Sequence, residues 1–175
     1  RGLAALPGFV RPDAVAAMAA EADALAAGEY HQDVSGTPYL ELPDEQHPAD
    51  HPRRYESRSA LTAIAYDRFP PGSLLRTLYE WDPLMRFVAA ILGLERIHRY
   101  ADPFGALNVA AMHEGDELGW HFDQTDFVVS LALQASEHGG EFEVAHDLRT
   151  TDDEHYDDVA AVLHGVAPEI GRAHV

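Results

Sequence analysis

The sequence constrains its own fold most strongly between residues 119 and 142. His121 and Asp123 are separated by one residue, and a run of β-favouring apolar residues, 127–133, follows them. Side chains at positions i and i+2 share a face only where the chain is extended, because a helix turns them about 200° apart. The pair therefore predicts a strand over 120–123 whose imidazole and carboxylate reach the same ion, followed by a second strand over 127–134.

Two other His-x-Asp triplets are present, and their surroundings predict different roles. His155 and Asp157 fall in segment 151–164, which has an acidic first turn and a capping-box pattern at Thr151 and Glu154. That segment predicts a helix, on which the two side chains point apart. We therefore interpret this triplet as solvated helix surface.

The third triplet, His31 and Asp33, follows an alanine-rich segment that predicts a helix over 12–27. It opens segment 31–58, which is polar and rich in Pro, Asp and His, and which predicts a long loop or lid. The His- and Asp-containing stretch 44–51 within it is interpreted as a flexible loop rather than a second metal site, because its prolines and irregular spacing do not preorganise ligands.

Composition excludes several classes of chemistry. The 175 residues favour one domain, and the sequence contains no cysteine, which excludes thiolate metal sites, disulfides and thiol nucleophiles. All twelve basic residues are arginine, so Schiff-base and P-loop lysines are excluded as well. A net charge of −18 argues against nucleic acid or an acidic membrane as partner. No apolar run is long enough to span a bilayer and no signal peptide is recognisable, so we expect a cytoplasmic protein that acts on a small molecule.

The order of predicted elements suggests an α+β, mainly β fold. Residues 1–95 are expected to form helical support and a lid, and residues 96–175 to form a β core of closely spaced strands. Together they would form an antiparallel barrel or sandwich buttressed by N-terminal helices. Besides the elements above, the sequence predicts helices over 73–80 and 82–93 and strands over 59–66, 97–100, 105–112 and 141–145.

The stretch 108–142 resembles the non-haem Fe(II)/2-oxoglutarate-dependent oxygenases, which have a double-stranded β-helix (jelly-roll) core. The resemblance is closest to the prolyl-hydroxylase-like branch, in which His-x-Asp is followed by an apolar strand and then by Gly-Gly-Glu-hydrophobic. Here these elements are His121-Phe-Asp123, 127–134 and Gly139-Gly-Glu-Phe142. The block 102–149 is also similar to bacterial small-molecule hydroxylases related to amino-acid halogenases.

The resemblance implies that His121 and Asp123 ligate Fe(II), with 2-oxoglutarate and dioxygen as co-substrates. In the related halogenases a small residue replaces the carboxylate ligand so that chloride can bind iron. Asp123 therefore implies hydroxylation rather than halogenation. The expected substrate is a small molecule such as a free amino acid or a biosynthetic intermediate.

Three further residues are candidates for contacts with ligands. Asn108 is a poor strand former among apolar neighbours. It either hydrogen-bonds 2-oxoglutarate or the substrate, or satisfies a bulge. Trp120 is expected either in the wall of the substrate pocket or in the core, and Arg149 either at the substrate or on the surface.

The family pattern also requires a second histidine on a later strand, followed by an arginine or lysine for the far carboxylate of 2-oxoglutarate. His174 lacks the apolar strand that should precede it, and His138 and His146 lie too near the first pair along the chain. We therefore expect the jelly roll to be completed by strands beyond residue 175.

Two other classes stay open. The main alternative is a non-catalytic jelly-roll binding module that has lost the distal metal ligand. A cupin-like isomerase or hydrolase ranks last, since cupins typically use a His-x-His pair and the sequence has none.

Overall fold

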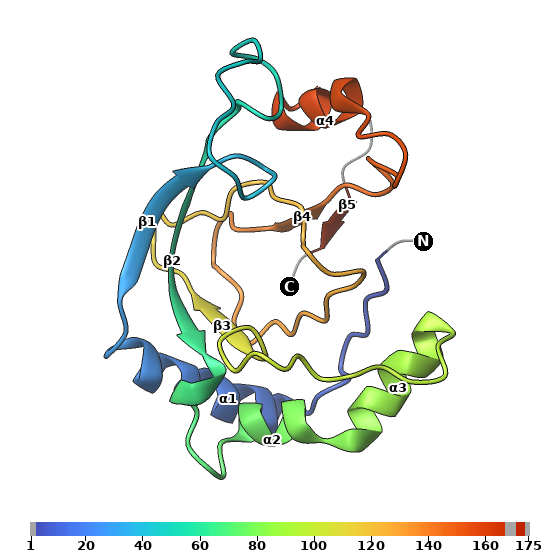
Figure 1. Ribbon diagram of the computed structural model, residues 1–175. Coiled ribbons are helices and arrows are strands. Elements are labelled where there is room, and N and C mark those ends of the chain that lie inside the picture. Colours follow the sequence, from blue (N-terminus) through green and yellow to red (C-terminus); the bar gives the residue numbers. More distant parts are fainter. Residues whose placement is uncertain (1–2, 167–170, 174–175) are drawn as a thin grey trace. The chain divides into compact units, whose positions relative to one another are not determined.

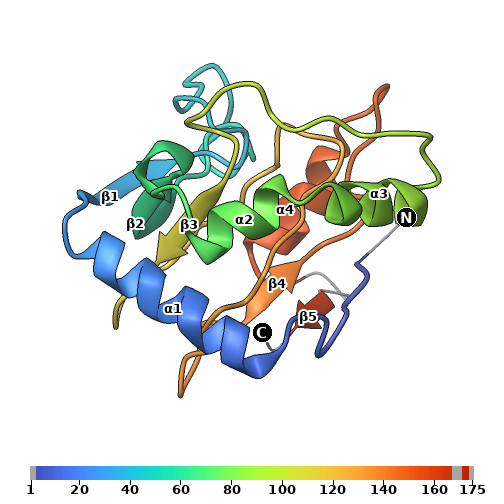
Figure 2. The same ribbon diagram turned by 90° about the horizontal axis from the view of Figure 1, so that it is seen from below.

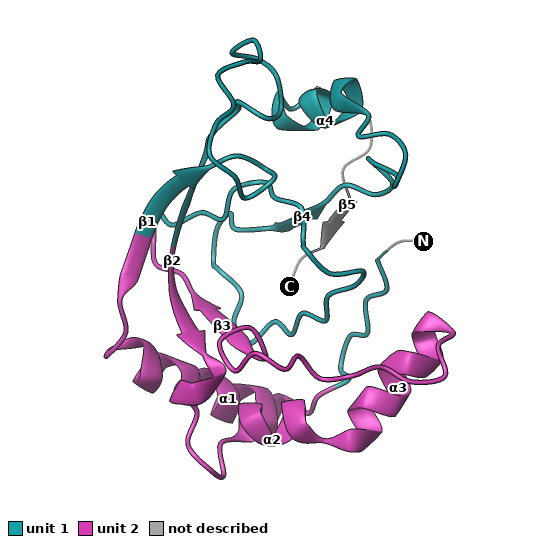
Figure 3. Cartoon of the chain, viewed as in Figure 1, with its two compact units in different colours: residues 1–9, 33–60, 115–175 teal, residues 10–32, 61–114 magenta. Residues whose placement is uncertain are grey.

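The computed structural model describes residues 3–166 and 171–173 as a mixed α/β structure. An open antiparallel three-stranded sheet has the order β1-β2-β3 (Figure 1). The chain divides into two compact units, each assembled from separate segments (Figure 3). Unit 1 comprises residues 1–9, 33–60 and 115–175, and unit 2 comprises residues 10–32 and 61–114.

Helices and strands alternate irregularly along the chain, and the strands β1 and β2 each contain residues of both units. The elements in chain order are α1 (Pro12–Ala26), β1 (His31–Gly36), β2 (Ser57–Ala65), the 3-10 turn η1 (Tyr66–Arg68), α2 (Leu74–Glu80), α3 (Asp82–Leu92), β3 (Asn108–Ala111), β4 (Phe142–Val144), α4 (Tyr156–Leu163) and β5 (Gly171–Ala173).

In unit 2, α1 packs against both α2 and β3, and Figure 2 shows α1 and α2 side by side. The inner face of α1 buries Met18 and Ala22, whose i, i+4 spacing places them on one stripe of the helix. Ile64 on β2 and Phe69 after η1 are almost completely buried. Burial of such apolar side chains is the main stabilising contribution to this unit.

Local signals begin and end the helices of unit 2. Ser73 caps α2, because its side-chain oxygen accepts a hydrogen bond from the amide of Arg76 at 3.0 Å. Arg99 donates through Nε to the carbonyl of Tyr79 at 3.2 Å and so satisfies a carbonyl group at the end of α2. Gly93 ends α3 in the left-handed conformation, with φ 68°, which glycine adopts without steric cost.

In unit 1, α4 contributes three buried apolar side chains to the core, those of Val159, Val162 and Leu163. β4 pairs with β5 in an antiparallel arrangement, with Phe142 opposite Ala173. Within the described residues, no helix is long and apolar enough to cross a membrane.

The helices are the elements that the sequence predicts best. The helices predicted over 12–27, 73–80 and 82–93 are confirmed as α1, α2 and α3. The strand predicted over 59–66 is confirmed as β2, and shorter strands, β3 and β4, form inside the ranges 105–112 and 141–145.

Three predicted strands do not form in the described part of the chain: 97–100, 120–123 and 127–134. A strand needs a partner for its ladder of hydrogen bonds, and β propensity alone does not supply one. Within the second of these segments, 120–123, the amide of Phe122 donates to the carbonyl of Pro38 at 2.8 Å. Proline has no N–H to return, so it cannot donate a reciprocal bond to that pairing.

Two further predictions are corrected. The loop prediction for His31 and Asp33 is wrong, since both lie on β1. Helix α4 forms as expected but begins at Tyr156 rather than near Thr151. The turn before it is held by Thr150, whose hydroxyl oxygen accepts from the amide of Asp153 at 3.0 Å.

Candidate metal centre at His121 and Asp123

The segment that precedes the His121–Asp123 triplet is attached to β2 within unit 1. The amide of Ala60 donates to the carbonyl of Glu117 at 2.8 Å, and Ser59 pairs with Leu118 in an isolated antiparallel bridge. The amide of Gly119 donates to the hydroxyl oxygen of Ser59 at 3.1 Å. The triplet therefore begins two residues after an anchored backbone position.

Gly119 also approaches β2 more closely than any other residue type could. A Cβ atom at this position would lie 2.9 Å from the carbonyl oxygen of Arg58 and closer still to the side chain of Ser57. Backbone atoms cannot give way cheaply at such a distance. Glycine is thus required here for close approach, as glycines next to a strand often are.

The ring of His121 is oriented by this same glycine. Its Nδ1 lies 2.9 Å from the carbonyl oxygen of Gly119. A carbonyl only accepts, so Nδ1 carries the proton and the neutral ring has its lone pair on Nε2. We infer this tautomer from the hydrogen-bond partner.

Nε2 of His121 lies 3.6 Å from Oδ1 of Asp123, so the structure brings the two predicted ligands together. Their side chains are 32% and 56% exposed, which leaves the pair accessible from solvent. A lone pair and a carboxylate oxygen that face each other repel unless a positive charge lies between them. A metal ion meets that need, and so does a proton on Nε2, which would make the pair a simple salt bridge.

Phe122, the middle residue of the triplet, makes side-chain contacts of its own. Its ring lies 5.2 Å, centroid to centroid, from that of Tyr39, and Cζ of Arg149 lies 4.1 Å from the Phe122 centroid. The second contact has cation–π geometry. Nη1 of Arg149 in turn lies 3.6 Å from Oε2 of Glu154, with which it forms an ion pair.

Sequence reasoning missed the aromatic and arginine cluster that continues from Phe122. Arg53 donates through Nε to the hydroxyl of Tyr156 at 2.8 Å, and its Cζ lies 4.7 Å from the ring centroid of Tyr39. Burial, together with the nearby Glu154 carboxylate, raises the pKa of Tyr39 to about 12. More than 100 positions separate Arg53 from Tyr156 in sequence, so no local pattern marked this cluster.

The three residues predicted to contact ligands lie in different parts of the chain. Arg149 belongs to unit 1 and stacks on Phe122. Trp120 is half-buried, next to Gly119. Asn108 is exposed at the start of β3 in unit 2, where it pairs with Ala65.

A third ligand for the pair is not found among the described residues. No third His, Asp or Glu in that part of the chain joins His121 and Asp123 in a group that could hold a metal ion. This applies to His138 and His146 as well, while His174 lies outside the described residues.

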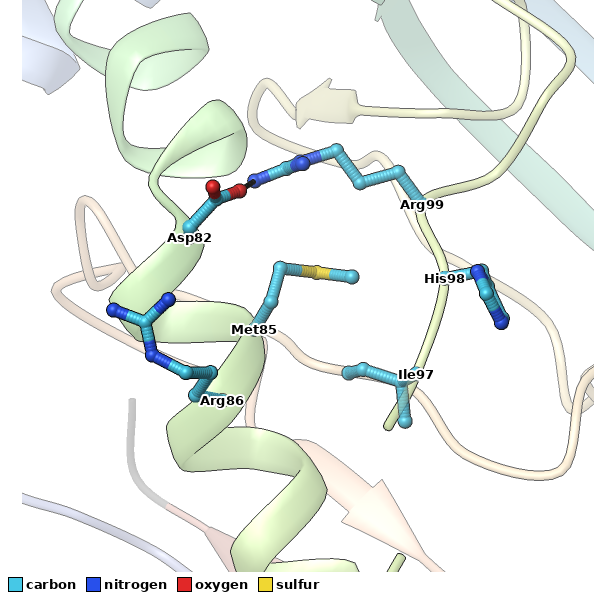
Figure 4. Close-up of a pocket in the computed structure, with 6 residues that line it drawn as sticks. All are labelled: Asp82, Met85, Arg86, Ile97, His98 and Arg99. Carbon is cyan, nitrogen blue, oxygen red and sulfur yellow. Dashed lines mark hydrogen bonds and ion pairs between the residues drawn. The ribbon is translucent and has the colours of Figure 1, made fainter. Parts of the chain in front are cut away.

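Two open cavities in unit 2 lie at Arg99. One, of about 250 Å³, lies between α3 and residues 97–99, and Figure 4 shows Met85 and Ile97 directed into it. The ion pair between Arg99 and Asp82, at 2.7 Å, closes one side. The other, of about 420 Å³, is lined in part by Tyr66, Tyr79, Tyr100 and Arg99. Neither cavity is lined by a residue that the sequence predicts in the site.

Comparisons of this chain with protein-family models, with curated proteins and with solved structures gave no match.

Proposed function

We propose that this protein is an Fe(II)- and 2-oxoglutarate-dependent hydroxylase that acts on a small molecule, with His121 and Asp123 as two of the iron ligands. The observation that supports the proposal is the orientation of His121, which directs Nε2 at Asp123 while Nδ1 bonds to the carbonyl of Gly119. Histidines that bind metals almost always donate their other ring N–H in this way. The jelly-roll core is part of the proposal.

Among the residues that the structure describes, the donor set has the ligand types that iron prefers but one ligand too few. One imidazole and one carboxylate are two of the three ligands in a 2-His-1-carboxylate site, and a further imidazole is needed to complete it. With the third ligand in place, bound iron and 2-oxoglutarate would supply the oxidation of a substrate C–H bond by dioxygen.

In this proposal the residues of the chain bind the metal ion and orient the substrate. His121 offers Nε2 as a ligand atom, and Asp123 supplies a carboxylate at the position where halogenases leave room for a halide. Phe122 fixes the direction of both through its contacts with Tyr39 and Arg149. Arg149 keeps a partly exposed guanidinium that can donate hydrogen bonds to an anionic group of the substrate, and half-buried Trp120 would form part of the pocket wall.

The test uses the purified protein under anaerobic conditions. Fe(II) and 2-oxoglutarate together should produce a charge-transfer absorption band, and admission of oxygen with substrate should produce succinate. His121→Ala and Asp123→Ala should each abolish both signals while the circular dichroism spectrum stays unchanged.

His155→Ala is the matched control, since His155 belongs to a His-x-Asp triplet that borders α4. It should retain the band and the succinate. Signals that survive both His121→Ala and Asp123→Ala would refute the proposal. A protein without any band would be a binding module, in which His121 and Asp123 form only a salt bridge.

A further inference from the structure

A second pair of imidazoles, His31 and His113, comes together in unit 2. Thr62 on β2 lies directly opposite Ala111 on β3 in the antiparallel pair, so their side chains share one face of the sheet. His113 follows two residues after Ala111, the last residue of β3. His31, the first residue of β1, contacts Thr62 from the other side of β2.

Side-chain contacts bring the two rings close together. The rings of His31 and His113 lie edge to face, with centroids 5.8 Å apart and planes at 73°. One ring nitrogen of His31 lies within 4.8 Å of one ring nitrogen of His113. Both residues are exposed, so an ion from solvent can reach them.

Thr62 gives this pair an orienting partner. Its side chain is buried, with 3% of the residue exposed, and its Oγ1 lies 3.1 Å from Nδ1 of His31. If Nδ1 donates to this oxygen, Nε2 of His31 keeps its lone pair for an ion. In metal sites of other proteins, the ring nitrogen that does not bind the metal usually donates a hydrogen bond to an oxygen, and this bond orients the histidine.

We propose that His31 and His113 bind a divalent transition-metal ion of the copper and zinc class, at a site independent of His121 and Asp123. Imidazole nitrogen is the ligand that such ions favour, and the chain has no cysteine to offer a softer site. Water completes the coordination in the proposal. The net charge of −18 raises the local concentration of cations at any such site.

The test is a titration of the His121→Ala protein with Cu²⁺, followed by electron paramagnetic resonance. This background removes the proposed iron ligand, so the outcome does not depend on the proposed function. The spectrum should show nitrogen splitting from two imidazoles. His31→Gln and His113→Gln should each remove one of the two nitrogens, and Thr62→Val should weaken Cu²⁺ binding about tenfold, as loss of an orienting partner does.

His98→Gln is the control, because His98 is an exposed histidine of the same unit. It should leave the spectrum and the affinity unchanged. Circular dichroism checks that each variant is folded. A two-nitrogen spectrum that persists in both His31→Gln and His113→Gln, or a spectrum of the His121→Ala protein without nitrogen splitting, would overturn the proposal.

Discussion

The imidazole rings of His47 and His51 stack face to face, with centroids 3.9 Å apart and planes at 6°. His51 also packs on Tyr156 of α4, with ring centroids 4.4 Å apart. Its Nδ1 accepts a hydrogen bond from the amide of Arg53 at 3.2 Å, so this nitrogen carries no proton. These contacts fasten the irregular segment 44–53 to α4 through a neutral imidazole.

The first prediction concerns pH. Burial lowers the pKa of His51, and the neighbouring His47 and Arg53 lower it further. The folded state thus binds a proton on His51 less readily than the unfolded state does. The stability contributed by the neutral ring is complete above the unfolded pKa of about 6.5 and is lost as pH falls through that value toward the folded pKa.

Chemical denaturation at a series of pH values from about 7.5 down to about 5, a range that spans the ordinary pKa of imidazole, should show a falling free energy of unfolding. His51→Gln should make that fall shallower. His98→Gln, at an exposed position, should leave the slope as in wild type. An equal slope in wild type and His51→Gln would contradict the prediction.

The second prediction concerns Gly119. Gly119→Ala should lower the free energy of unfolding by about 2 kcal/mol, because the added methyl group collides with the backbone of Arg58. The same change should shift His121, since its ring is bonded to the carbonyl of Gly119. Urea denaturation measures the first effect, and the proton resonances of the His121 ring report the second.

Gly36→Ala is the matched control for Gly119→Ala. Gly36 also lies in unit 1, and a Cβ there would meet nothing within 4 Å. The control should be neutral or slightly stabilising, because alanine restricts the unfolded chain. Equal effects of the two substitutions would show that close approach to β2 does not constrain residue 119.

The third prediction concerns the contact between Arg53 and Tyr156. Tyr156→Phe removes the hydroxyl that accepts from Arg53 Nε and keeps the ring that packs on His51. It should lower the free energy of unfolding by about 1 kcal/mol, the usual net value of such a bond when the donor is partly solvated. Thermal denaturation would measure the change.

Tyr30→Phe serves as its control, since Tyr30 is 83% exposed. That substitution should leave the melting temperature unchanged. A melting temperature for Tyr156→Phe equal to that of wild type would mean that solvent replaces the bond at no cost.

The helices could be predicted because their signals are local. Ser73 supplies a capping oxygen three residues from the amide that it binds, and Gly93 ends α3 through its own backbone freedom. The strands could not be predicted as well, because a strand depends on a partner far along the chain. Segment 127–134 has strong β propensity and forms no strand, whereas His31 and Asp33 lie in a polar segment that does form one.

For the candidate site, the i, i+2 spacing of His121 and Asp123 predicted that their side chains meet, but the strand on which that prediction rested does not form. Tertiary packing determines which ring nitrogen of His121 faces Asp123 and which side chains pack on Phe122. Those features depend on the approach of Gly119 to β2 and on residues 39 and 149, which folding brings together across more than 100 positions of the chain. Contacts between residues so far apart in the sequence produce no periodic pattern in it, because each depends on tertiary packing and not on local spacing.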